Sequence, residues 1–146
     1  MKKVFIDFET DGLEGKIIEI AATDKKENIF FQKNPENLNN FYDDLKKYYK
    51  NDFIIIFWHK WMIEYLIKHE LNFYNNLSGK SLIFTDIYSF MDKNRHGRYK
   101  IDYITSNLIN RKHKGNAKDD AIDLKDCYYK LSKINKKRKS LLYERL

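Results

Sequence analysis

The spacing of apolar and polar positions along the chain predicts a mixed α/β fold. Short β-branched and aromatic runs bounded by turn residues predict strands over residues 4–8, 17–22, 28–32, 53–57 and 81–85. Apolar positions at helical spacing predict helices over residues 41–50, 61–69, 87–91, 99–109 and 117–131, the last continuing into a basic tail. Three strands followed by alternating helices and strands indicate a five-stranded mixed sheet flanked by helices.

Two carboxylates stand at the end of the first expected strand. Because side chains alternate along a strand, Asp7 and Glu9 face one side of the sheet while Phe8 faces the other. Two such carboxylates repel each other unless a cation lies between them, and Mg²⁺ prefers oxygen ligands. Ligands of α/β sheets also gather at the carboxyl ends of the strands. The pattern therefore predicts a metal site; the alternative is an exposed strand end that acidic residues merely cap.

Composition and charge restrict the class of protein. The 146 residues contain no Pro/Gly/Ser-rich linker, so we expect one domain over residues 1–146. A single cysteine, Cys127, excludes an internal disulfide. Since the chain shows neither a signal-peptide pattern nor a long apolar run, we expect a cytoplasmic protein without a membrane partner. The net charge of +7 indicates either a nucleic-acid partner or a lysine-rich composition alone, and the oligomeric state stays open.

The segment from Asp7 to Leu13 carries the most specific motif of the chain. It reads Asp-Phe-Glu-Thr-Asp-Gly-Leu. This resembles the first motif, Asp-x-Glu-Thr-x-Gly-Leu, of the DEDD superfamily of 3′–5′ exonucleases, which includes polymerase proofreading subunits, ribonuclease T and oligoribonuclease. The resemblance implies a ribonuclease-H-like fold and a nucleic-acid substrate, DNA or RNA, with a free 3′ end. It also implies hydrolysis of the terminal phosphodiester by two ions of Mg²⁺ or Mn²⁺, roughly 3.5–4 Å apart.

The second motif of that family, typically His-Asn-x-x-Phe-Asp, is matched in part after the fourth strand. His59 stands in the place of the histidine, and Glu64 occupies the position of the aspartate. The resemblance therefore implies that Glu64 is a metal ligand. The alternative is a solvent-facing helix residue paired with Lys60 or Lys68.

The third motif lies at the start of the last helix, where Ala117 to Ala121 is similar to the family's Ala-x-x-Asp-Ala. By this match Asp120 is the fourth metal ligand, and it falls beside the apolar stripe of the helix. We expect Asp119 and Asp123 to be solvated charges on the outer face of the helix.

The general base is where the chain departs from the family. The His-type branch carries a histidine five residues before the third-motif aspartate, and Gly115 stands there. The Tyr-type branch carries a tyrosine four residues before it, and Asn116 stands there. His113 is the nearest candidate, since imidazole is the usual group for taking a proton from water at neutral pH. The alternative for His113 is a basic loop residue that only touches phosphate.

Further residues are expected to hold the substrate. By resemblance Thr10 and Leu13 lie under the terminal nucleotide. The other substrate-binding candidates are His59, Arg111, Lys112 and Lys114. The basic segments 93–100, 111–114 and 136–139 would follow the path of the strand. The rival interpretation is a nucleic-acid-binding module that has lost catalysis, and an endonuclease on the same fold is a third.

Overall fold

The structure of the protein is a computed structural model that describes residues 1–12, 15–77, 81–91 and 100–144. The strands are β1 (Lys2–Thr10), β2 (Ile17–Thr23), β3 (Ile29–Lys33), β4 (Phe53–Phe57) and β5 (Ser81–Ile83). The helices are α1 (Leu38–Tyr49), α2 (Lys60–His69), α3 (Leu71–Leu77), α4 (Phe84–Met91), α5 (Ile101–Ile109) and α6 (Ala117–Glu144). None of the helices in these ranges is both long and apolar enough to cross a membrane.

The strands form a single sheet in the order β3-β2-β1-β4-β5. β1 and β2 pair antiparallel, as do β2 and β3, while β4 runs parallel to β1 and β5 parallel to β4. The expected five-stranded mixed sheet flanked by helices is therefore confirmed, and its arrangement is consistent with a ribonuclease-H-like fold.

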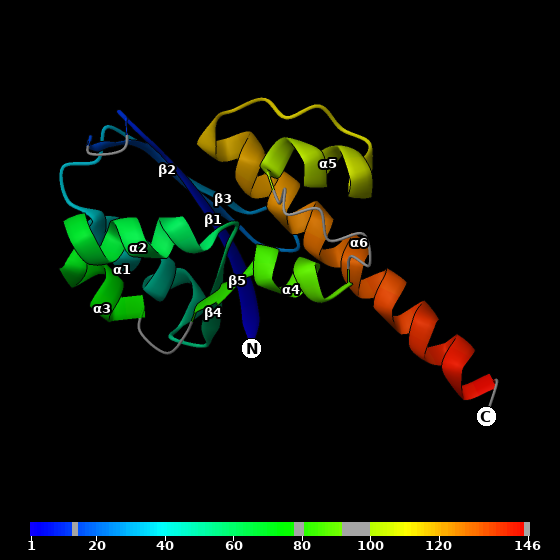
Figure 1. Cartoon of the computed structure of the whole chain (residues 1–146). Coiled ribbons are helices and arrows are strands. Elements are labelled where there is room, and N and C mark those ends of the chain that lie inside the picture. Colours follow the sequence, from blue (N-terminus) through cyan, green and yellow to red (C-terminus); the bar gives the residue numbers. More distant parts are fainter. Residues whose placement is uncertain (13–14, 78–80, 92–99, 145–146) are drawn as a thin grey trace.

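Helices cover both faces of the sheet (Figure 1). Phe5 and Phe8 of β1 show which helices cover each face, because side chains at an odd and an even position of a strand point to opposite faces of the sheet. Phe5 packs against Tyr128 and Tyr129 of α6, with ring centroids 5.4 and 5.7 Å away. Phe8 packs on the other side against Tyr65 of α2, at 5.6 Å. Asp7 and Glu9 therefore share the face of the sheet that α6 covers.

A buried tryptophan ties the centre of the sheet to α6. Trp58 directly follows β4 and has no exposed surface. Its indole N–H donates a hydrogen bond of 3.0 Å to the backbone carbonyl of Asp120, and its own carbonyl accepts from the N–H of Thr85 at 3.0 Å. A buried indole N–H needs such a partner, so this contact helps to hold the first turns of α6 beside β4.

Several elements differ from the sequence prediction, among them α3, β5 and α1. Residues 71–77, for which no element was predicted, form α3, a short helix that buries only Phe73 and Leu77 and whose periodicity is correspondingly weak. β5 ends at Ile83 because α4 begins at Phe84. α1 begins at Leu38, three residues before its first predicted residue, since Asn37 caps it by accepting a 2.9 Å hydrogen bond from the N–H of Asn39.

Candidate metal centre

The carboxylates of β1 meet α6 where the two elements approach closely. Asp7 is 2% exposed and lies beside Ala21 of β2 in the antiparallel register. Ala21 is buried together with Ala117 and Ala121 of α6. Because the separation of packed elements depends on the size of the side chains between them, these alanines let the start of α6 approach the sheet. Asp120, which is 1% exposed, is thereby brought to the carboxylates of β1.

Asp7, Glu9 and Asp120 form a group that could hold a cation. Each offers one oxygen, and the three oxygens lie within 4.8 Å of one another. Oxygens that bind one Mg²⁺ at about 2.0–2.1 Å are separated by no more than about 4.2 Å, so small side-chain movements suffice to bind it. Asp7 Oδ2 and Asp120 Oδ1 are buried without a hydrogen-bond partner. Buried unpaired oxygens of this kind are suited to binding a positive ion.

The crowding of the acids shifts their proton affinities. Burial raises the pKa of Asp7 well above its ordinary value, and the charges of Asp120 and Glu9 raise it further. Burial also raises the pKa of Asp120, with additional contributions from a hydrogen bond and the charge of Glu9, while a hydrogen bond from the Gly115 backbone opposes the shift. The group therefore favours either bound protons or a bound cation over three free negative charges.

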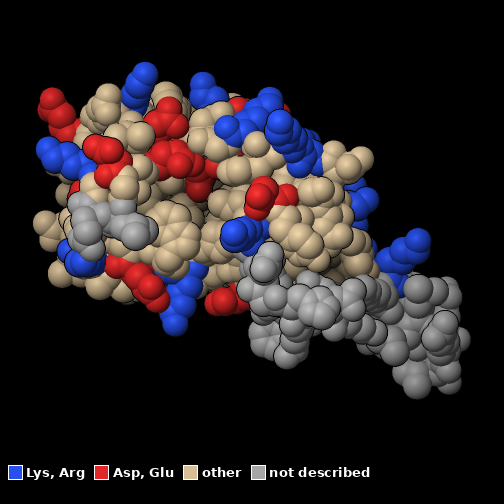
Figure 2. Space-filling view, turned by 45° about the horizontal axis from the view of Figure 1, so that its top comes forward, with Lys and Arg blue, Asp and Glu red and all other residues tan. Residues whose placement is uncertain are grey.

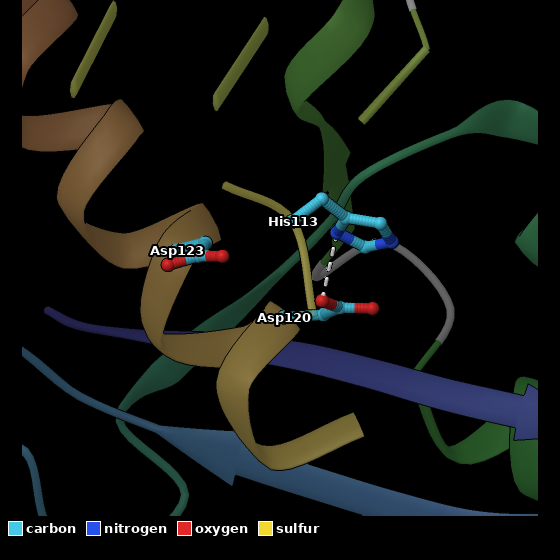
Figure 3. A group of neighbouring side chains, drawn as sticks. All are labelled: His113, Asp120 and Asp123. Carbon is cyan, nitrogen blue, oxygen red and sulfur yellow. Dashed lines mark ion pairs between the residues drawn. The ribbon is translucent and has the colours of Figure 1, made fainter. Parts of the chain in front are cut away.

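His113 lies against Asp120 of this group, as Figure 3 shows. The loop before α6 carries it, and its Nδ1 is 3.0 Å from Asp120 Oδ1. Neither atom has a partner with hydrogen-bond geometry, so the contact is a close approach, not an aligned hydrogen bond. The other ring nitrogen, Nε2, would lie 4.0 Å from a Cβ at Gly115, where φ is +75°. The imidazole therefore lies beside position 115, which corresponds to the histidine of the His-type exonucleases that the chain resembles.

Asp123 and Arg111 form an ion pair next to His113. Arg111 Nη1 lies 2.6 Å from Asp123 Oδ1 and 2.9 Å from Asp126 Oδ2. These hydrogen bonds raise the pKa of the guanidinium. Asp123 is 2% exposed, so its prediction as a solvated charge was wrong. Its position three residues after Asp120, on the same helix face, is the sequence signal that could have identified it.

A second group of possible metal ligands includes Asp123. One ligand atom each from His113, Asp120 and Asp123 lies within 4.8 Å of the others (Figure 3). Asp123 Oδ2 is buried without a hydrogen-bond partner. Asp120 belongs to both groups, so its carboxylate lies between the two places where a cation could bind.

The start of α6 is fixed by polar contacts that the sequence did not reveal. Glu19, the partner of Glu9 in the register of β1 and β2, accepts a 3.2 Å hydrogen bond from the N–H of Ala117. Asn116 accepts from the N–H of Asp119 at 2.8 Å, and its amide donates to the Asp119 carboxylate at 2.7 Å. These contacts satisfy the backbone N–H groups of Ala117 and Asp119 in the first turn of α6. Asp119 is therefore a half-buried capping residue, not a solvated charge.

Other predicted site residues lie outside these groups. Glu64 is exposed on α2, and neither group of carboxylates includes it. His59 precedes α2 half-buried, and burial lowers the pKa of its imidazole. Thr10 donates a 2.8 Å hydrogen bond to the carbonyl of Gly12, whereas Leu13 lies outside the described residues.

Lys112 and Lys114 are exposed on either side of His113. Figure 2 shows one face of the molecule, on which acidic side chains gather with lysine and arginine side chains around them. Of the three basic segments, most of 93–100 lies outside the described residues, and Arg111 of the second is held by two carboxylates.

Comparison with known proteins adds no family to this description. No protein-family model matches the chain, and no curated protein matches it.

Proposed function

We propose that the protein is a metal-dependent 3′–5′ exonuclease of the DEDD type, acting on DNA or RNA. The observation that carries the proposal is the convergence of Asp7, Glu9 and Asp120 with buried oxygens that lack a partner. These are the residues that the first and third motifs assign to metal binding. A cluster of buried acids costs folding free energy, so its presence is best explained by a ligand of opposite charge.

The three carboxylates would hold a divalent cation such as Mg²⁺ or Mn²⁺. When bound, such an ion lowers the pKa of water and stabilises the negative charge that develops on a phosphodiester during hydrolysis. The burial of Asp7 and Asp120 keeps water from screening their negative charge, which strengthens their attraction for the ion.

His113 is the proposed general base. Its Nε2 would accept the proton of the attacking water, while Nδ1 faces the carboxylate of Asp120. A carboxylate in that place orients the imidazole and stabilises the cation formed when the ring accepts a proton. Gly115 is compatible with this role, because it places no side chain beside Nε2, from which a Cβ at this position would lie 4.0 Å away.

The position of a second ion has two candidates. Asp120 is shared with the group that contains Asp123, and these two carboxylates could hold it while His113 stays free to act as base. The resemblance instead implies Glu64, which is exposed on α2. Titration with Mn²⁺ by calorimetry counts the ions. A second ion that disappears in Asp123→Asn assigns it to the first location, and one that disappears in Glu64→Gln assigns it to the second.

The substrate would enter by its 3′ end. By resemblance Thr10 and Leu13 contact the terminal nucleotide, with His59 close by. Lys112 and Lys114 are exposed next to His113 and would contact phosphates near the reacting end. Arg111 is less suited to this role than the sequence suggested, because Asp123 and Asp126 already occupy its guanidinium.

A nucleic-acid-binding module without catalysis is the second candidate. Glycine at position 115 and the exposed place of Glu64 favour it, since both depart from the motifs of the active family. The two functions share a ligand but differ in whether the strand is shortened.

The test is incubation of 5′-labelled single-stranded DNA and RNA with the purified protein in Mg²⁺, Mn²⁺ or EDTA. We expect a metal-dependent ladder that shortens from the 3′ end, lost in Asp7→Asn and retained in Asp44→Asn, an exposed acid on α1. Binding without cleavage in both metals would favour the second candidate. Cleavage of a circular substrate, which has no free end, would identify an endonuclease instead.

A further inference from the structure

A second surface of interest lies away from the carboxylates. It is a cleft of about 560 Å³ between the middle of α6, the start of β1 and the turn after β2. The residues that matter for its chemistry are Lys3, Lys25, Lys133, Lys136, Tyr128 and Tyr129. We call this set the α6 lysine cleft. A smaller hollow of about 290 Å³ shares Lys3, Lys25 and Tyr129 with it and adds Lys2 and Lys26.

Acids of the described residues do not balance the positive charge of the cleft. Lys125 and Asp126 also line it, but they neutralise each other at 2.9 Å, and each has a further partner, Glu27 and Arg111 respectively. In the described part of the chain, no ion pair involves Lys3, Lys25, Lys133 or Lys136. Four lysine charges therefore face one cleft without a carboxylate partner.

Asp24, the acid that lines the smaller hollow, already accepts hydrogen bonds from the protein. The Asp24 carboxylate accepts hydrogen bonds from the backbone N–H groups of Lys26 and Asn28, at 2.9 and 3.1 Å, and from the hydroxyl of Tyr49 at 2.7 Å. These bonds hold the turn after β2 in place. Both carboxylate oxygens of Asp24 thus accept hydrogen bonds, and no ion pair joins Asp24 to a lysine in the described part of the chain.

The tyrosines give the cleft a rigid wall that can donate hydrogen bonds. Tyr128 and Tyr129 are half-buried and pack on Phe5. Lys25 Nζ lies 5.2 Å from the centroid of the Tyr129 ring, which holds the ammonium at the cleft by a cation–π contact. Burial raises the pKa of both tyrosines, so their hydroxyls stay protonated and remain donors.

We propose that the α6 lysine cleft binds the phosphodiester backbone of a nucleic-acid strand and anchors the part of the strand that lies outside the catalytic site. Lysine ammonium groups and tyrosine hydroxyls are donors that phosphate oxygens accept. Among the residues whose side chains the structure describes, none that lines the cleft is an arginine, asparagine or glutamine, the side chains that read base edges in pairs of hydrogen bonds. Binding there is therefore independent of sequence. The inference rests on the proposed function for the identity of the strand.

The length of α6 sets how long a strand must be to reach both sites. Lys133 follows Asp120 by 13 residues on the same helix, which corresponds to about 20 Å at about 1.5 Å per residue. A stacked strand advances about 3.4 Å per nucleotide, so at least about six nucleotides are needed to cover this distance along the helix axis. Oligonucleotides of four nucleotides can occupy one of the two sites, whereas longer ones occupy both.

The test measures binding by fluorescence anisotropy in EDTA, where cleavage does not occur. Labelled single strands of 4 and 16 nucleotides are titrated with the full chain, with Lys133→Gln/Lys136→Gln, and with Lys46→Gln/Lys47→Gln as a control. The control removes the same charge from exposed positions on α1. For the 16-mer we expect the first pair to raise Kd about 10-fold and to reduce the salt slope by roughly two, and the control pair to change Kd less than about 2-fold.

Equal losses in the two pairs would overturn the proposal, because net charge alone would then explain binding. Displacement of the 16-mer by an acidic peptide at the same charge concentration would also overturn it in favour of a protein partner. Failure of the exonuclease is distinguishable: wild-type protein that never cleaves but keeps length-dependent binding retains the cleft and loses only the proposed function.

Discussion

Replacing Asp120 by asparagine is expected to stabilise the metal-free protein. Asparagine keeps the shape of the side chain and an oxygen that can accept the hydrogen bond from the Gly115 backbone. Its amide can donate to Glu9, so the pair no longer competes for a proton. The substitution therefore removes a charge that the buried site holds unfavourably, while the same change abolishes a metal ligand.

The magnitude follows from the proton affinity of the site. Burial, together with Glu9, raises the pKa of Asp120 from 3.8 to about 8. At pH 7 the folded protein retains a proton that the unfolded chain has lost, and about 3 pH units at about 1.36 kcal/mol each limit the cost to about 4 kcal/mol. Because Glu9 shares the proton and neighbours relax, we expect about half of this, roughly 2 kcal/mol. The melting temperature should then rise by about 4–8 °C.

The pH dependence of the stability gained in Asp120→Asn independently checks the sign of the effect. A carboxyl whose folded pKa is raised imposes no cost below its unfolded pKa, and the cost grows as pH rises toward about 8. At pH 5 the gain in Asp120→Asn should fall below about 1 kcal/mol. Thermal melts followed by circular dichroism in EDTA at pH 5 and pH 8 measure both values, with Asp44→Asn as the exposed control. A variant that melts at or below the wild-type temperature at pH 8 would refute this account of the site.

Three further predictions concern the same site. Saturating Mn²⁺ should raise the melting temperature more at pH 8 than at pH 5, because the cation competes with protons for Asp120 and fewer protons compete at the higher pH. An equal rise at both pH values would contradict this. His113→Asn should lower kcat/KM by about 10²–10⁴-fold in a cleavage assay, with nucleic-acid affinity in EDTA unchanged, whereas a parallel loss of affinity would indicate a phosphate contact. Arg111→Gln should destabilise the protein by about 1–3 kcal/mol in urea unfolding, and adding Asp123→Asn should recover part of this loss, because the buried acid would otherwise lack its cation.

The pattern of apolar residues along the chain determined most of the strands of the sheet and the faces on which their side chains lie. β4 has the predicted bounds, since a continuous β-branched and aromatic run is buried on both faces and differs clearly from its neighbours. Alternation along β1 placed Asp7 and Glu9 on one face, a consequence of backbone geometry that needs no knowledge of distant residues. The spacing of Asp120 with Ala117 and Ala121 likewise indicated its inward face on α6.

Only the tertiary structure decided which side chains meet. Sequence spacing places His113 two residues away from the family's position, and the turn at Gly115 brings its ring to Asp120. Asp123 reads as a surface acid on the helix but is covered and paired with Arg111. Glu64 has the spacing of a ligand, yet the turn of α2 on which it lies leaves it exposed.

The physical reason is the range of the interactions concerned. Strand alternation and helical periodicity arise from local backbone geometry, so a short stretch of sequence contains them. The cleft that collects Lys3, Lys25 and Lys133 joins the start of β1, the turn after β2 and the middle of α6, which lie far apart in the chain. Their proximity depends on how closely α6 packs on the sheet, and that is set by the volumes of side chains such as Ala21 and Phe5, not by any local pattern.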